Sequence, residues 1–154
     1  MKAITILQPW AELIIQGYKH NETRSWLTSH TGPIAIHAAK FRKLDHEVYK
    51  QIAYAIGIKP EKYNGSWLYY MEHGIPDDRF GAVLGIVTLE KVLPTTIKAA
   101  SPKEKLLGDF SAGRYAWQVK VIEKYDKPIP ARGKQGLWNW DPPSTADNPE
   151  TGSE

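Results

Sequence analysis

A short polar segment of the chain places three chemically active side chains close together. Lys19, Glu22 and Arg24 fall within six residues, and Trp26 follows two positions later. If residues 21–27 form a strand, then Glu22, Arg24 and Trp26 project from one face of it. A guanidinium and an ammonium can bind phosphate, and an indole can stack on a base. The segment therefore predicts a nucleic-acid-binding site.

The same residue types allow two other interpretations. Glu22 and Arg24 could form an ordinary surface ion pair, which contributes little to stability, while Trp26 belongs to the core. Lys19 and Glu22 could instead act as a general acid–base pair if burial brought their pKa values toward neutrality. Residue types alone leave these alternatives open.

The elements around this segment are predicted from hydrophobic spacing and from turn residues. Residues 3–7 are expected to form a short strand, after which Pro9 stands in the first turn of a helix, where its missing N–H costs nothing. Gly17 is placed to end this helix in the left-handed conformation. Lys19 therefore lies just past the helix and ahead of the strand over residues 21–27.

Strands predominate in the rest of the chain. The further elements expected are a strand over 34–38, a helix over 42–56, a buried strand over 82–92, a short helix opened by the capping box at 101–104, and a strand over 115–121. Pro128 and Pro130 should end or edge the last strand, and residues 57–80 mix turn residues with aromatic ones. The fold class is α+β, a small and mostly antiparallel barrel with two to three flanking helices.

Composition limits the class of protein. The chain has 154 residues, enough for one domain, and no cysteine. It carries a net charge of +3, but residues 141–154 hold four acidic and no basic residues, so that residues 1–140 carry +7. Residues 1–140 are therefore expected to form one basic domain, and residues 141–154 a disordered acidic tail. A cytoplasmic protein is expected, because the sequence lacks a signal peptide and a membrane span.

Other common chemistries have no pattern in the sequence. The histidines have no metal-ligand spacing; they are His20, His30, His37, His46 and His73. The nucleophile elbow, the Walker A loop and the dinucleotide glycine fingerprint are all missing. We therefore expect neither a metal nor a cofactor.

The polar segment also matches a family signature. Gly17, Lys19, Glu22 and Arg24 occupy every fixed position of the G-x-K-x-x-E-x-R motif of the ASCH domain. The chain resembles this family over roughly residues 3–140, in segments that include 7–11, 84–87, 128–133 and 137–138. The resemblance implies a PUA-like β-barrel with a cleft, proposed in the family to bind RNA or DNA.

The resemblance also implies which residues form the cleft. Lys19, Glu22 and Arg24 take the family role, and Gln8 and Trp10 are expected to line the same cleft. Two later cations, Arg132 and Lys134, lie beside glycines whose backbone can approach a phosphate closely. They are either part of the site or an ordinary basic turn. RNA or single-stranded DNA is the expected partner.

An enzyme remains the alternative. Small proteins that look like ASCH relatives deacetylate N4-acetylcytidine with the signature lysine and a threonine three residues later, and others have been proposed as ribonucleases. Here Glu22 stands at that position, and Thr23 is expected on the opposite side of the strand, which weakens a threonine-nucleophile mechanism. A hydrolase of a modified nucleoside or of RNA would then use Lys19 and Glu22 as its acid–base pair.

Overall fold

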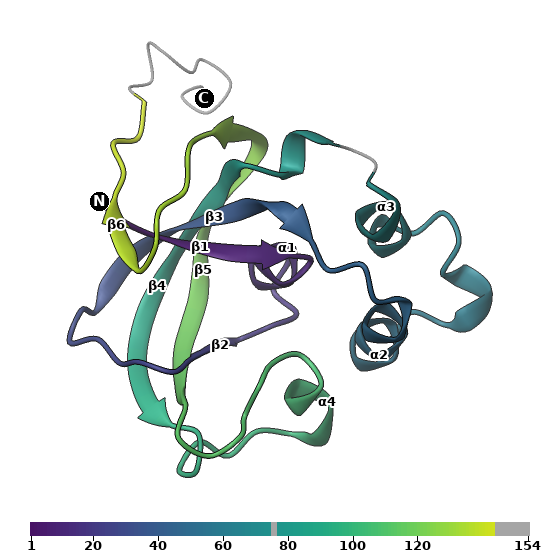
Figure 1. Cartoon of the computed structure of the whole chain (residues 1–154), viewed down its shortest axis with the longest axis horizontal. Coiled ribbons are helices and arrows are strands. Elements are labelled where there is room, and N and C mark those ends of the chain that lie inside the picture. The colour runs from purple at the N-terminus through teal and green to yellow at the C-terminus, as the bar shows by residue number, and fades with distance from the viewer. Residues whose placement is uncertain (75–76, 144–154) are drawn as a thin grey trace.

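One six-stranded sheet organises the protein (Figure 1). The computed structural model describes residues 1–74 and 77–143. The strands are β1 (Lys2–Gln8), β2 (Asn21–Arg24), β3 (Gly32–Arg42), β4 (Ala82–Pro94), β5 (Tyr115–Pro130) and β6 (Leu137–Asn139), in the spatial order β2-β5-β4-β3-β1-β6. The β1–β3 pair is parallel, and the other neighbouring pairs are antiparallel.

Helices lie in the connections between these strands. They are α1 (Trp10–Ile15), α2 (His46–Ile56), α3 (Trp67–His73) and α4 (Pro102–Lys105), with single 3-10 turns at Pro60–Lys62 and Asp77–Arg79. In Figure 1, α2 and α3 stand side by side at one end of the sheet, and α4 lies beyond β2 in the β4–β5 connection. The fold class α+β is confirmed.

The predicted closed barrel is not confirmed, because the described residues form an open sheet. β2 and β6 stand at opposite ends of the strand order, and in the described part of the chain each pairs with one neighbour only. With four and three residues, these edge strands offer few backbone groups with which to close the sheet. Residues 1–74 and 77–143 contain four α-helices, where two or three were predicted.

Capping residues explain where the helices begin and end. Gly17 follows α1 with φ of 85°, as predicted. The Asp45 side chain accepts a hydrogen bond from the Glu47 amide at the start of α2, so this helix begins four residues later than its apolar spacing predicts. Leu44 consequently lies outside the helix and is exposed. Ser101 caps α4 through the Glu104 amide, as the capping box predicts.

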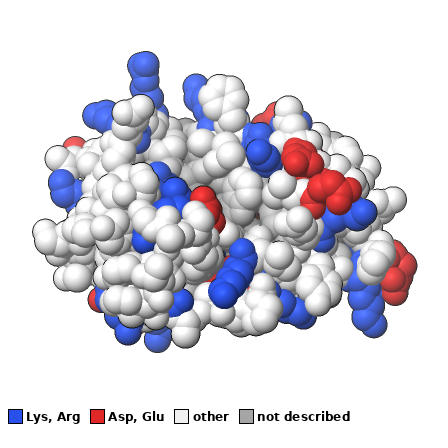
Figure 2. Space-filling view, turned by 60° about the horizontal axis from the view of Figure 1, so that its bottom comes forward, with Lys and Arg blue, Asp and Glu red and all other residues white. Residues whose placement is uncertain are grey.

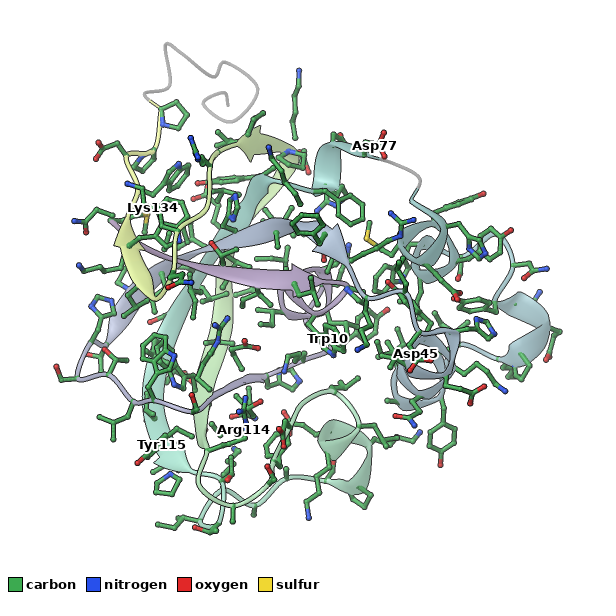
Figure 3. The ribbon with its side chains drawn as sticks, viewed as in Figure 1. Trp10, Asp45, Asp77, Arg114, Tyr115 and Lys134 are labelled. Atoms are coloured by element: carbon green, nitrogen blue, oxygen red, sulfur yellow. The ribbon has the colours of Figure 1, made fainter. Side chains whose placement is uncertain are left out.

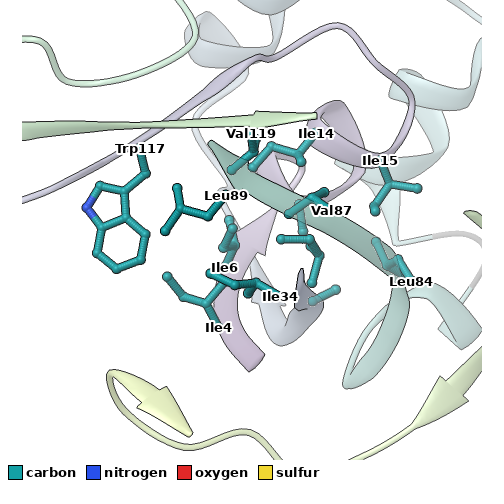
Figure 4. Close-up of a cluster of buried hydrophobic side chains, with 13 residues drawn as sticks. Ile4, Ile6, Ile14, Ile15, Ile34, Leu84, Val87, Leu89, Trp117 and Val119 are labelled. Carbon is teal, nitrogen blue, oxygen red and sulfur yellow. The ribbon is translucent and has the colours of Figure 1, made fainter. Parts of the chain in front are cut away.

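The main core lies between the sheet and α1. Figure 4 shows its side chains, which come from β1, α1, β3, β4 and β5 and include Ile4, Ile6, Ile14, Ile34, Leu84, Val87, Leu89, Trp117 and Val119. A separate cluster joins α1 to α2 and α3 through Leu13, Tyr49, Ile52, Leu68 and Met71. Burial of these two clusters fixes α1 and α2 relative to the sheet.

Two segments differ from their sequence-based descriptions. Residues 57–80 contain the α3 helix, capped by Ser66 and ended by Gly74, which the many turn residues concealed. β5 continues through Pro128 to Pro130, where Ala82 and Val83 of β4 still pair with it.

The predicted disordered tail falls largely on residues 144–154, which lie outside the described residues. Within the described ranges, no helix is long and apolar enough to cross a membrane.

Candidate functional site

A pocket of about 680 Å³ lies where β1, β2, α2 and the segment after α4 meet. Figure 2 shows this face, hollowed near its centre with basic and acidic side chains around the hollow. The lining consists of Thr5, Ile6, Leu7, Trp10, Lys19, Glu22, Thr23, Arg24, Lys43, Val48, Gln51, Leu106, Leu107, Gly108, Asp109 and Arg114. The three charged signature residues therefore do converge on one open pocket.

Lys19 is the most deeply placed of these charged groups. Its backbone N–H donates to the Leu13 carbonyl at 3.0 Å, which fixes it at the end of α1. The side chain is only 2% exposed, and its Nζ donates to the Asn21 carbonyl at 2.6 Å and lies 3.6 Å from Glu22 Oε1. Burial lowers the pKa of Lys19 below its ordinary value of 10.5, against the opposing pull of Glu22. Lys19 thus lines the pocket as a buried cation held by structural contacts.

Glu22 and Arg24 form the accessible part of the signature. Arg24 Nε donates to Glu22 Oε2 at 2.9 Å, and its Nη2 donates to the Thr5 carbonyl at 2.9 Å, so the guanidinium ties β2 to β1. The Arg24 side chain is 24% exposed and that of Glu22 is 13% exposed. The Glu22 carboxylate lies between Lys19 and Arg24, and it orients the guanidinium at the pocket wall.

The segment after α4 forms the facing wall. Arg114 donates from Nε to the Asp109 carbonyl at 3.1 Å and from Nη2 to the Thr23 carbonyl at 3.1 Å. Asp109 in turn donates its backbone N–H to Thr23 Oγ1 at 3.2 Å. A Cβ on Gly108 would lie 3.2 Å from Lys19 Nζ, so a larger residue there would crowd the ammonium, and it would contact Thr23 Oγ1 at 3.4 Å.

This wall corrects the prediction for Thr23. It was expected on the side of the strand away from the site, yet it lines the pocket with Lys19 and Glu22. Strand alternation holds within β2, but β2 is an edge strand of four residues, and the chain after α4 folds over its far side. The two sides of the strand therefore both border the pocket.

Trp10 and the start of α2 complete the pocket. Trp10 is half-buried against both the main core and the α2–α3 cluster, and it lines the pocket as predicted. Lys43, exposed in the link between β3 and α2, supplies a further cation, and Gln51 of α2 an amide. Figure 3 labels Trp10 and Arg114 on the side where α1, β2 and the segment after α4 approach each other.

Four predicted site residues lie outside this lining. The buried Gln8 side chain accepts from the Glu12 amide and donates to the Arg79 carbonyl, so it caps α1 instead of facing the cleft. Trp26 packs edge-on against Trp117, with ring centroids 4.8 Å apart. β2 ends at Arg24, so the strand alternation that would have aligned Trp26 with Glu22 stops two residues earlier.

Arg132 and Lys134 are exposed away from the pocket, and Figure 3 shows Lys134 beside β6. The reason is the packing of Gly133 between them: a Cβ there would come within 2.7 Å of Thr5 Oγ1 and 2.8 Å of the His37 ring. The close backbone approach that the glycines suggested is therefore made to the protein's own side chains. Among the two interpretations of this segment, the structure favours the basic turn.

His37 belongs to the same packing. Its Nε2 lies 2.7 Å from the Ala131 carbonyl, and its Nδ1 lies 3.2 Å from Thr5 Oγ1, which also accepts from Trp138 Nε1. Burial lowers the pKa of His37, in keeping with a neutral ring that donates from Nε2. His37 is a structural histidine. Within residues 1–74 and 77–143, no group of three or more histidine or acidic side chains is placed to hold a metal ion.

Charge in the pocket is predominantly positive. The lining has two carboxylates, those of Glu22 and Asp109, and four cationic side chains, those of Lys19, Arg24, Lys43 and Arg114. Lys43 and Arg114 were missed by sequence reasoning, because neither is close in sequence to the signature and only the fold brings them to it.

The protein is a small α+β domain with an open mixed sheet and a charged pocket at its β2 edge. The pocket is built around the signature residues Lys19, Glu22 and Arg24. A family model for the ASCH domain matches residues 4–129, so the chain belongs to the ASCH domain family. A crystal structure of a mutant ZmASCH protein from Zymomonas mobilis is similar, with a TM-score of 0.47 and 13% sequence identity over 97% of this chain and 92% of that chain. A comparison with curated protein sequences gives no match.

Proposed function

We propose that the protein binds single-stranded nucleic acid, RNA or DNA, in the pocket around Lys19, Glu22 and Arg24. The observation that carries the proposal is the convergence of four cations and the Trp10 indole on one open pocket. Membership of the ASCH family, whose fold is of nucleic-acid-binding type, supports it. Arg24, Arg114 and Lys43 would contact phosphate, and Trp10 would stack on a base. Glu22 could accept from a base amino group.

The salt dependence of binding tests this proposal. We expect Lys43→Gln to reduce the slope of log affinity against log salt by about 0.7, the value for one phosphate contact on a single strand. Lys43 is suited to the test because it is exposed, so its loss should leave the fold intact. Fluorescence anisotropy with a labelled oligonucleotide at several salt concentrations gives the slope.

Lys62→Gln is the matched control, since Lys62 is also exposed but lies in the 3-10 turn outside the pocket lining. Its slope should equal that of the wild type. If the wild-type protein bound neither RNA nor single-stranded DNA at low salt, the proposed function would be wrong.

A hydrolase is the second candidate, favoured by the lowered pKa of the buried Lys19 beside Glu22. With N4-acetylcytidine, Glu22 would take a proton from water while the water oxygen attacks the acetyl carbon. The Lys19 ammonium would give its proton to N4 as the C–N bond breaks, which yields acetate and cytidine. Attack on RNA would need the same two groups.

If this candidate is right, the protein should release cytidine from N4-acetylcytidine or shorten labelled RNA, and Glu22→Gln should lower that rate at least about a hundredfold, because a general acid or base contributes 10² to 10⁴. Chromatography of the nucleosides and gel analysis of the RNA measure the products. Absence of product from both substrates at high protein concentration would contradict the hydrolase and leave nucleic-acid binding as the proposed function.

A further inference from the structure

Phe41 is the most exposed large apolar side chain in the described part of the chain, at 77%. It stands near the end of β3, in the run Lys40-Phe41-Arg42-Lys43. Single exposed apolar side chains are common on protein surfaces, but an exposed ring between cations has the residue types that bind single-stranded nucleic acid. Its surroundings therefore bear on what the pocket binds.

The neighbours of Phe41 show which way it faces. Lys40 packs over Gly81, where a Cβ would meet its Cγ at 3.0 Å, and Arg42 Nε donates to the Glu72 carbonyl at 2.9 Å. Both of these cations are thus directed toward the protein. Because side chains alternate along an extended chain, Phe41 points away from Lys40 and Arg42 within β3. Lys43, two residues further on, lines the pocket.

An irregularity in the sheet sets Phe41 opposite a residue that lines the pocket. Ile6 pairs with Ala38, but the next β1 pair joins Gln8 to Arg42, so Leu7 alone stands opposite three residues of β3. Leu7 itself lines the pocket. Bulges of this kind re-aim side chains and often lie beside functional sites. Here the bulge includes Phe41 and places it across from a pocket residue.

We infer that Phe41 is a second base-stacking platform, for the nucleotide next to the one held in the pocket. This inference rests on the proposed function. An exposed ring stacks on any base, and Lys43, two residues further along the chain in the pocket lining, would contact the phosphate that links the two nucleotides. A strand of two or more nucleotides would then use both places, whereas a mononucleotide would use the pocket only.

The test compares a short oligouridylate with uridine monophosphate. Phe41→Ala should weaken oligouridylate binding at least about fivefold, the lower end of what one base–aromatic stack contributes. Its affinity for uridine monophosphate, measured by competition, should stay at the wild-type value. Phe41→Trp should restore oligouridylate binding. Ile122→Ala removes an exposed apolar side chain outside the pocket lining and should change neither affinity.

The outcomes separate this inference from the proposed function. If Phe41→Ala bound oligouridylate as tightly as the wild type while Arg24→Ala did not, the platform would be wrong and the pocket would stand. If the wild type bound neither ligand, both proposals would fail. Sedimentation adds a further outcome: a wild-type dimer that Phe41→Ala converts to monomer would assign the ring to a protein interface and overturn the inference.

Discussion

Arg24→Ala is expected to lower the affinity for single-stranded oligonucleotides by about tenfold to a hundredfold, because a hydrogen bond to a charged group contributes about 1.5–3 kcal/mol. The variant removes a pocket cation and also frees Glu22, which Arg24 now neutralises at 2.9 Å. The Glu22 carboxylate would keep only Lys19 as a partner, at 3.6 Å, and would repel phosphate more strongly. Anisotropy titration at low salt, where phosphate contacts are strongest, measures the effect.

Arg24→Lys provides the matched control for charge. A lysine keeps the positive charge but has a single nitrogen, whereas Arg24 reaches Glu22 and the Thr5 carbonyl with two. We therefore expect an intermediate affinity. The unfolding free energy of Arg24→Ala should change by about 1 kcal/mol or less, since the side chain is partly exposed. Wild-type affinity in Arg24→Ala would contradict the role given to this residue.

Lys19→Ala is expected to destabilise the fold by about 2–4 kcal/mol, which makes it chiefly a stability variant and only secondarily a binding variant. The Asn21 carbonyl would lose its donor at 2.6 Å, and an unpaired buried polar group costs about 1–3 kcal/mol. The space left by the aliphatic stem adds to the cost. Urea unfolding measures the change, and Lys43→Ala, at an exposed lysine of the same pocket, should stay within about 0.5 kcal/mol of the wild type.

The pH dependence of stability gives Lys19 a second readout. Since burial lowers the pKa of Lys19 in the folded protein, the unfolded chain binds this proton more tightly. The wild type should therefore gain stability as the pH rises through the folded pKa toward 10.5, and Lys19→Met should lack that gain. The two proteins should be compared below about pH 10. Burial raises the pKa of Tyr49 to about 12, so at higher pH its ionisation in the unfolded chain favours unfolding. Equal slopes in both proteins would contradict the buried, desolvated state of Lys19.

Local patterns predicted the elements well where one residue type decides the structure. Gly17 ends α1, Ser101 caps α4, and alternating residues define the start of β5, since each depends on chemistry within a few positions. Closure of the sheet depends on how edge strands meet, and the short β2 and β6 do not pair with each other within the described residues. No local pattern carries that information.

The candidate site was predicted in its centre and missed at its walls. The signature placed Lys19, Glu22 and Arg24 together, and all three line the pocket. Trp26 was expected beside them because strand alternation was extended past the end of β2, but it packs against Trp117. Of the two predicted tryptophans, Trp10 lines the pocket. Lys43 and Arg114 come to the pocket through β3 and the chain before β5. Only tertiary packing brings these two cations to the pocket, and the spacing of residues in the sequence does not reveal it.

The pocket draws its walls from four stretches of chain between Thr5 and Arg114, joined through strands that are neighbours only in the assembled sheet. A molecule held there would touch the first strand and the last third of the domain at once. Occupancy must therefore oppose melting of the whole domain, by about 2.7 kcal/mol at a hundred times the dissociation constant. Thermal-shift screening of nucleosides, nucleotides and oligomers would thus report on this pocket without any label.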